Sequence, residues 1–184
     1  MKKMIILEGL PGVGKTTLLQ KIKERNIKNI FISNELIHPL VTSGKPTTED
    51  FMQNDDMKMQ GGNCDFAVVD RGPISTLSYN QTKRIVDLAY KFNLSILSNW
   101  FSRYIPILQS EKIAVYYLIN SSSDYYLRRN KNSDPHGTVE NQKLMENISL
   151  FNCKKYVKNL IIKSYNHKNI AEVADEIINQ LMRP

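Results

Sequence analysis

Residues 9–16 read GLPGVGKT, which matches the phosphate-binding pattern G-x-x-x-x-G-K-[ST] in full. Its glycines let the backbone turn its amides inward onto a phosphate, and Lys15 supplies a positive charge within reach of the β- and γ-phosphates. The Thr16 hydroxyl is placed to ligate Mg²⁺, and a helix that begins here adds its positive end. The residues predicted to bind ATP are Gly9, Pro11, Gly12, Val13, Gly14, Lys15, Thr16 and Thr17. The alternative is an accidental glycine-rich turn between a strand and a helix.

The residues around this loop predict strands that alternate with helices. Strands are expected at residues 4–8, 29–33, 66–70, 113–119 and 160–164, where short apolar runs occur. Helices are expected at residues 15–25, 47–60, 74–91, 94–108, 124–131, 139–157 and 170–182. Strands that are apolar on both faces indicate a parallel sheet covered on two sides. The predicted fold class is α/β, a three-layer α/β/α P-loop NTPase fold with a five-stranded parallel sheet.

Composition narrows the class of protein further. The chain has 184 residues, of which 41% are hydrophobic and 23% charged, with a formal charge of +7. These values fit one globular domain and exclude a disordered chain, a collagen-like repeat or a disulfide scaffold. The positive charge suggests a polyanionic partner. Cys64 and Cys153 lack the spacing of a metal site, and no run approaches the ~18 apolar residues of a membrane span. A cytoplasmic protein without a membrane partner is expected.

A second set of candidate residues follows the strand at residues 66–70 (FAVVD), which ends in the carboxylate of Asp70. Ligands of parallel sheets bind beyond the carboxyl ends of the strands, so Asp70, Arg71 and Glu35 are expected in one crevice with the loop. Asp70 is a candidate metal ligand together with Thr16, and Arg71 is a candidate for binding phosphate or transition-state charge. Alternatively, Asp70 caps the next helix, while Arg71 and Glu35 are solvated.

Three segments, GLPGVGKTT, DRGPISTLSYN and LINSSSDYYLRR, together resemble the P-loop nucleotide and nucleoside kinases, in particular the thymidylate kinase and deoxynucleoside kinase branch. The order of these segments holds along almost the whole chain. The resemblance implies a single kinase domain at residues 1–184 with a mobile lid at about 128–140. It implies transfer of the γ-phosphoryl group of ATP, with Mg²⁺, to a nucleoside monophosphate or a deoxynucleoside. It also implies a homodimer packed through the middle helices.

The same resemblance assigns roles to individual residues. Asp70 would hold Mg²⁺ or act as a base, and Glu8 would orient its neighbours. The residues implied to contact the acceptor are Glu35, Arg71, Tyr79 and Asn80. Lys15 is the one cation of the phosphate loop, so further positive charge at the transferring group must come from elsewhere, and a lid arginine is the implied source. Of the neighbouring pair Arg128 and Arg129, Arg128 is predicted to be catalytic; a solvated helix end is the alternative.

The sequence is compatible with more than one acceptor. Gly72-Pro73 follows Asp70-Arg71 where thymidylate kinases usually have an aromatic residue, so another small molecule is an alternative acceptor. The helical cluster of Trp100, Phe101, Arg103 and Tyr104 either stacks on a base or packs in the core. A nucleotide-binding regulatory ATPase is the alternative from a different class. Nucleic acid is a disfavoured partner, because the chain has no basic arm and no aromatics interleaved with basic residues.

Overall fold

The computed structural model describes residues 3–39, 46–121, 125–128, 137–165 and 168–183, and of residues 127 and 128 it describes the backbone only. Within these ranges five strands form one parallel sheet in the order β2-β3-β1-β4-β5. The strands are β1 (Lys3–Glu8), β2 (Ile30–Ser33), β3 (Phe66–Asp70), β4 (Ile113–Asn120) and β5 (Asn159–Tyr165). This order puts β1, and the glycine-rich loop that follows it, in the middle of the sheet.

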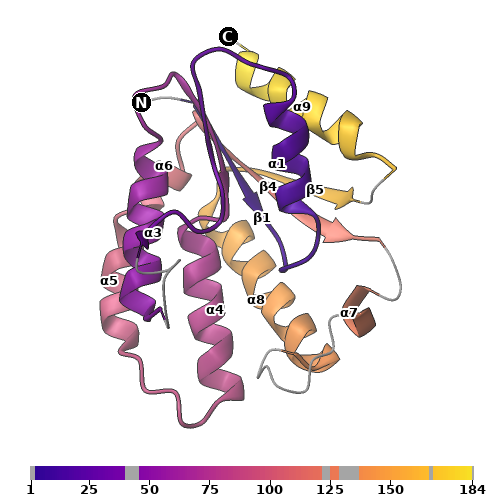
Figure 1. Ribbon diagram of the computed structural model, residues 1–184. Coiled ribbons are helices and arrows are strands. Elements are labelled where there is room, and N and C mark those ends of the chain that lie inside the picture. The colour runs from indigo at the N-terminus through magenta and orange to yellow at the C-terminus, as the bar shows by residue number, and fades with distance from the viewer. Residues whose placement is uncertain (1–2, 40–45, 122–124, 129–136, 166–167, 184) are drawn as a thin grey trace.

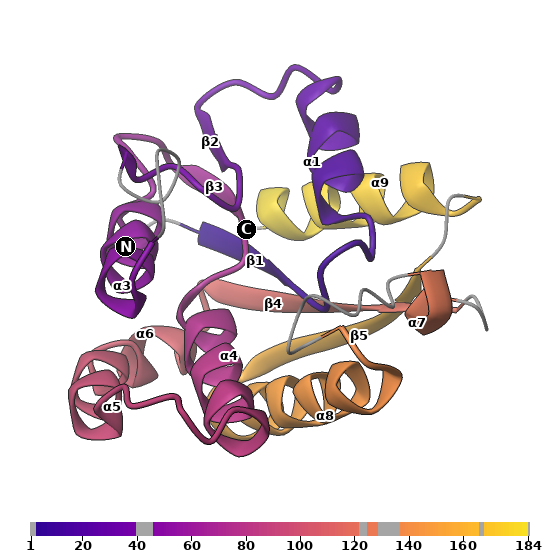
Figure 2. The same ribbon diagram turned by 60° about the horizontal axis from the view of Figure 1, so that its bottom comes forward.

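Helices cover both faces of this sheet (Figures 1 and 2). They are α1 (Lys15–Lys23), α3 (Thr48–Gln60), α4 (Pro73–Val86), α5 (Leu94–Ser102), α6 (Ile105–Leu108), α7 (Tyr125–Arg128), α8 (Val139–Tyr156) and α9 (Ile170–Met182). Figure 2 shows α1 and α9 on one face and α4, α5 and α8 on the other. The predicted three-layer α/β/α fold with a five-stranded parallel sheet is therefore confirmed. Among the described residues, no helix combines the length and hydropathy that a bilayer span requires.

Alternate residues of β1 supply the two hydrophobic cores. Ile5 and Leu7 pack with α1 and α9, whereas Met4 and Ile6 pack with α4 and α5. All four side chains are almost completely buried. Burial of each such side chain stabilises the fold by about 1.5–3 kcal/mol, so the period-two pattern of β1 fixes which helices lie on which face.

The register of the strands brings their carboxyl ends to the same edge of the sheet. Leu7 of β1 pairs with Asp70 of β3, and Glu8 pairs with Tyr117 of β4. The phosphate loop leaves β1 at this edge, and Arg71 leaves β3 there. The register therefore places the loop beside the Asp70-Arg71 pair.

Two predicted helices are shorter than the periodicity suggested. The helix predicted at residues 74–91 ends at Val86, and the chain then turns so that the Tyr90 hydroxyl lies 2.9 Å from Thr48 Oγ1 in α3. The helix predicted at residues 94–108 is two helices, because Pro106 has no N–H to continue the helical hydrogen bonds. For the helix predicted at residues 74–91, a contact between residues distant in sequence outweighs the local periodicity.

Candidate functional site

The loop between β1 and α1 holds three glycines at positive φ, namely Gly9 at +128°, Gly12 at +76° and Gly14 at +107°. A Cβ atom at Gly9 would lie 2.4 Å from the carbonyl oxygen of Leu118, and one at Gly14 would lie 2.5 Å from Tyr165 Cε1. Both positions therefore need glycine, for backbone conformation and for space. Within the described structure no side chain caps α1 at Gly14, which leaves the first N–H groups of the helix free for a phosphate.

Lys15 lies across this loop. Its Nζ donates to the carbonyl oxygens of Gly9 at 3.0 Å and Leu10 at 3.1 Å, and the residue is only 4% exposed. Burial, with a smaller effect from the nearby charge of Arg71, lowers the pKa of Lys15 to about 7. A phosphate bound in the loop would supply an opposite charge and favour the ammonium form. The position suits the predicted role of Lys15, which stays a prediction.

Thr16 and Asp70 meet at the base of the loop. The Thr16 hydroxyl donates to Asp70 Oδ2 at 3.4 Å, and Asp70 Oδ1 is buried without a hydrogen-bond partner among the described residues. Burial raises the pKa of Asp70, against the opposing effect of the charges of Lys15 and Arg71. A hydroxyl and a carboxylate oxygen suit Mg²⁺, which takes few protein ligands and completes its shell with water and phosphate oxygens. The described residues contain no group of three or more His, Cys, Asp or Glu that would suggest another kind of metal site.

Arg71 follows Asp70 in a left-handed conformation, with φ +62°. Its Nε lies 2.8 Å from Glu35 Oε1, an ion pair that joins the ends of β3 and β2. Arg71 is 7% exposed, and its Nη2 is buried without a hydrogen-bond partner among the described residues. The Glu35 side chain is 44% exposed. The structure thus brings together the three residues that were predicted to share one crevice. Arg71 is buried, so the alternative that it is a solvated side chain is wrong.

Glu8, at the end of β1, contacts the turn that follows Asp70 and Arg71. Its Oε1 accepts a hydrogen bond from the Gly72 N–H at 3.1 Å, and its Oε2 accepts one from the Ser75 hydroxyl. Glu8 is fully buried, and this burial raises its pKa to about 7 although Ser75 and Arg71 act in the opposite direction. Glu8 therefore connects the start of the phosphate loop to the first turn of α4, and its orienting role stays a prediction.

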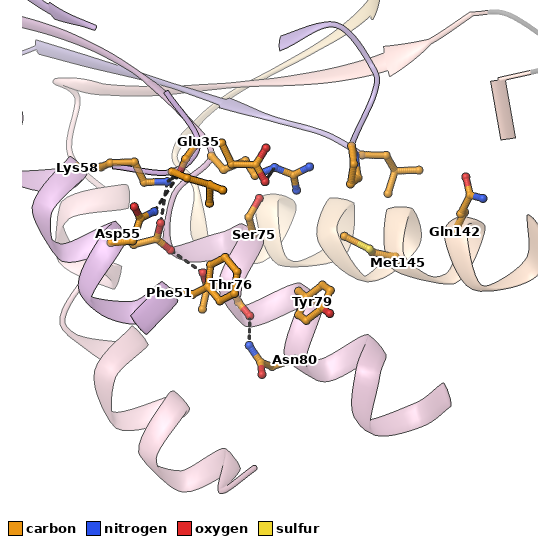
Figure 3. Close-up of a pocket in the computed structure, with 15 residues that line it drawn as sticks. Glu35, Phe51, Asp55, Lys58, Ser75, Thr76, Tyr79, Asn80, Gln142 and Met145 are labelled. Carbon is orange, nitrogen blue, oxygen red and sulfur yellow. Dashed lines mark hydrogen bonds and ion pairs between the residues drawn. The ribbon is translucent and has the colours of Figure 1, made fainter. Parts of the chain in front are cut away.

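A cavity of about 210 Å³ opens beside this turn, with Arg71 and Glu35 in its wall (Figure 3). The phosphate loop contributes Leu10 and Pro11 to the wall, the segment after β2 contributes Leu36 beside Glu35, and the other residues come from α3, α4 and α8. Figure 3 shows the predicted residue Tyr79 on α4 facing this space. The cavity is thus continuous with the phosphate loop and has a mixed apolar and polar wall, as small-molecule sites commonly have.

The predicted residue Asn80 lines the cavity but is engaged in holding helices together. Its Oδ1 accepts hydrogen bonds from Thr48 Oγ1 at 2.9 Å and from the Tyr90 hydroxyl, and its Nδ2 donates to the Thr76 carbonyl at 2.7 Å. Trp100 and Phe101 are buried in the core, and neither lines the cavity. The core interpretation of that aromatic cluster is therefore the one that the structure supports.

The lid predicted at about residues 128–140 falls mostly outside the described residues. Residues 129–136, which include Arg129, are outside them, and Arg128 is described only as the last residue of α7. The helix itself lies against the phosphate loop, because the Tyr125 hydroxyl donates to the Pro11 carbonyl at 2.6 Å. The catalytic role of Arg128 stays a prediction.

The cavity residues on α3 and α8 were not predicted from the sequence. The α3 residues are Phe51, Asn54, Asp55 and Lys58, and the α8 residues are Gln142 and Met145. Asn54 and Asp55 precede Lys58 by four and three positions, so both lie on the same face of α3 as Lys58. That spacing was the available signal, but a polar helical face usually indicates contact with solvent. Gln142 and Met145 carry no motif that distinguishes them from ordinary helix residues.

No protein-family model and no curated protein matches this chain. Solved structures do match over nearly its whole length. Thymidylate kinase from Candida albicans is 16% identical, with a TM-score of 0.64 over 97% of this chain and 90% of that one. Thymidylate kinase from Ehrlichia chaffeensis is 14% identical, with a TM-score of 0.62 over 99% of both chains. The YorR protein of Bacillus subtilis, solved with phosphorylated GDP, is 17% identical, with a TM-score of 0.60 over 96% of this chain and 94% of that one. The chain therefore has the P-loop fold of the thymidylate kinases, as the sequence resemblance implied.

Proposed function

We propose that the chain transfers the γ-phosphoryl group of ATP, in the presence of Mg²⁺, to a nucleoside or a nucleoside monophosphate. The observation that carries this proposal is the continuity of the site, since Leu10 and Pro11 of the phosphate loop also line the cavity that holds Arg71. A donor phosphate in the loop and an acceptor in the cavity would meet beside Asp70 and Arg71. The thymidylate kinase fold of the similar structures supports the same class of reaction.

The loop residues would hold the triphosphate by their amides and by the Lys15 ammonium. Thr16 and Asp70 would hold Mg²⁺ through a hydroxyl and a carboxylate oxygen. When bound, the ion neutralises charge on the β- and γ-phosphates. Arg71, which is buried and keeps Nη2 without a hydrogen-bond partner among the described residues, would stabilise negative charge on the transferring group. Arg128 is proposed to add a further cation there, because α7 lies against the loop through Tyr125.

The Arg71–Glu35 ion pair favours a nucleoside as the acceptor. A monophosphate in the cavity would compete with the Glu35 carboxylate for the guanidinium of Arg71, because both are anions. A nucleoside hydroxyl carries no charge, and Glu35 could accept its proton during the transfer. The similarity in fold to thymidylate kinases favours the monophosphate instead. The two acceptors are distinguished by the panel of nucleosides and monophosphates that follows.

The test is ATP consumption with Mg²⁺ across a panel of nucleosides, nucleoside monophosphates and single-stranded DNA. We expect one small acceptor to stimulate turnover, and we expect Lys15→Ala to lower it by about 100-fold or more while the protein stays folded. Stimulation by DNA alone, weakening steeply with salt, would instead indicate a nucleic-acid-dependent ATPase. Normal turnover in a folded Lys15→Ala protein would refute the proposal.

A homodimer and a cytoplasmic location belong to the same proposal. They are supported by the family resemblance and by the two free cysteines, Cys64 and Cys153, which suit a reducing compartment. Light scattering coupled to gel filtration tests the dimer directly, because it measures the mass in solution.

A further inference from the structure

Lys58 of α3 is a fully buried cation that the proposed reaction does not use directly. The residue is 1% exposed, and its Nζ has three oxygen partners from three parts of the chain. It lies 2.9 Å from Asp55 Oδ1, and it donates to the carbonyl oxygens of Glu35 and Asp70, each at 3.1 Å. A lysine ammonium has three protons, so all of them are engaged within the protein. Lys58 is therefore poorly suited to bind a substrate, although it lines the cavity.

The two carbonyl groups that Lys58 holds belong to the two candidate catalytic strand ends. Glu35 follows β2, and Asp70 is the last residue of β3. No described backbone hydrogen bond of the sheet joins these two residues, since the β2–β3 register ends at the Ser33–Val69 pair. Lys58 thus bridges the ends of the chain segments at Glu35 and Asp70, beyond the last residue pair of β2 and β3. Hydrogen bonds of the sheet no longer fix the separation of the two segments there.

Neighbours of Lys58 extend this bridge into a buried polar network. Asp55 Oδ2 accepts a hydrogen bond from the Thr76 hydroxyl of α4 at 2.7 Å (Figure 3). Asn54 donates to the Glu35 carbonyl at 2.9 Å and accepts from the backbone N–H groups of residues 37 and 38. Asn54 and Asp55 are 1% and 3% exposed. The network therefore fixes the segment after β2 against α3, and it connects α3 to α4.

The turn after Asp70 gives the position of that carbonyl particular importance. Arg71 has φ +62°, a conformation that a non-glycine residue keeps only where its surroundings enforce it. The Arg71 N–H donates to the Leu7 carbonyl at 2.9 Å, and the Asp70 carbonyl of the same peptide group is one of the two that Lys58 holds. Lys58 and β1 thus fix the same peptide from two sides. The direction in which the Arg71 guanidinium leaves the sheet depends on both.

We propose that Lys58 is a positioning residue, which sets the separation of Glu35 from the Asp70-Arg71 turn through its bonds to their carbonyl groups. This inference rests on the proposed phosphotransfer function. The ion pair to Asp55 and the bonds to the two carbonyls can be distinguished by experiment, because Asp55→Asn removes only the ion pair, whereas Lys58→Met removes both. The first serves stability, since an unpaired buried charge is costly. The second serves the geometry of the reaction.

The experiment compares Lys58→Met, Asp55→Asn and the double variant Asp55→Asn/Lys58→Met with wild type. Lys58→Met leaves the Asp55 carboxylate buried without its cation and is expected to lower the melting temperature most. The double variant removes that unpaired charge and is expected to regain much of the stability. Lys154→Met is the matched control, because Lys154 is an exposed lysine in the last turn of α8.

Four quantities are measured on each folded variant: the melting temperature, the Kd for ATP, and kcat and KM with the acceptor found for wild type. For the double variant we expect a Kd for ATP within about twofold of wild type and a kcat lower by about 100-fold, the effect of a misplacement of about 1 Å. Asp55→Asn, which keeps the lysine and both carbonyls, is expected to keep kcat within about tenfold.

The outcomes separate the positioning role from a structural one. Recovery of wild-type kcat together with stability in the double variant would overturn the inference, and so would failure of both Lys58 variants to fold. Retained ATP binding with lost kcat supports it. If wild type and Lys154→Met turn over no acceptor of the panel, the proposed function fails and the inference falls with it. If they are active and the double variant is equally active, the inference alone fails.

Discussion

Glu8→Gln should change how the stability of this protein depends on pH. Glu8 is fully buried, and its carboxylate accepts hydrogen bonds from the Gly72 N–H and the Ser75 hydroxyl. Burial raises its pKa from the ordinary 4.5 to about 7. Each pH unit of such a difference corresponds to about 1.4 kcal/mol, so ionised Glu8 lowers the free energy of unfolding by about 3 kcal/mol. Glutamine has nearly the same shape and carries no charge.

The sign of the change in stability with pH follows from which state, folded or unfolded, holds the Glu8 proton. Below pH 4.5 Glu8 is protonated in the folded and the unfolded chain, and it has no effect on the pH dependence. Between 4.5 and about 7 the folded protein keeps the proton and the unfolded chain loses it, so stability falls as pH rises. Above about pH 7 both states are ionised and the full loss is present. The Glu8→Gln protein therefore gains stability relative to wild type across this range.

The measurement is urea denaturation of wild type and Glu8→Gln at several pH values from 4.5 to 8, with the free energy of unfolding extrapolated to water. The expected result is that the difference between the two proteins shifts by about 3 kcal/mol in favour of the variant as pH rises. Glu172→Gln, which removes an exposed carboxylate in the first turn of α9, is the control. A difference between wild type and Glu8→Gln that stays constant across the whole range would refute the reasoning.

Two further predictions concern the phosphate loop and the metal. Gly14→Ala places a Cβ atom 2.5 Å from Tyr165 Cε1 at a φ of +107°, so we expect a loss of roughly 1–3 kcal/mol in unfolding free energy and at least tenfold weaker ATP binding by calorimetry. Unchanged ATP affinity would show that the observed loop conformation is not needed for binding. Asp70→Asn removes the carboxylate that meets Thr16, so the Mg²⁺ concentration for half-maximal turnover should rise by about tenfold or more, since truncation of a carboxylate ligand weakens hard-cation binding. An unchanged Mg²⁺ titration in an active variant would remove Asp70 from the metal site.

Much of the fold could be predicted because its signals are local. The apolar runs of the strands and the Gly-rich loop each involve residues close in sequence, and the structure contains all of them. The end of α4 at Val86 could not be predicted in this way. Beyond Val86 the chain turns so that Tyr90 forms a hydrogen bond with Thr48, and these two residues are far apart in sequence.

The candidate site divides in the same manner. Lys15, Thr16, Asp70 and Arg71 were identified because a motif or a strand end marks each of them, and the parallel register brings them together. The cavity wall from α3 and α8 was missed, because its residues have no such mark. Helical polar residues are usually solvated, and only packing between helices distinguishes those that are not.

By itself, the sequence predicted the glycine-rich loop, because glycines, a lysine and a threonine at fixed spacing between a strand and a helix are a local signal. Only the tertiary structure showed the cavity beside Arg71. The fold turned Asn54, Asp55 and Lys58 from a polar helical face into a buried network, and it forced Arg71 into a left-handed turn beside Glu35. The physical reason is that a buried charge is stable only where partner groups from distant segments of the chain surround it. The local sequence pattern does not show which segments come together.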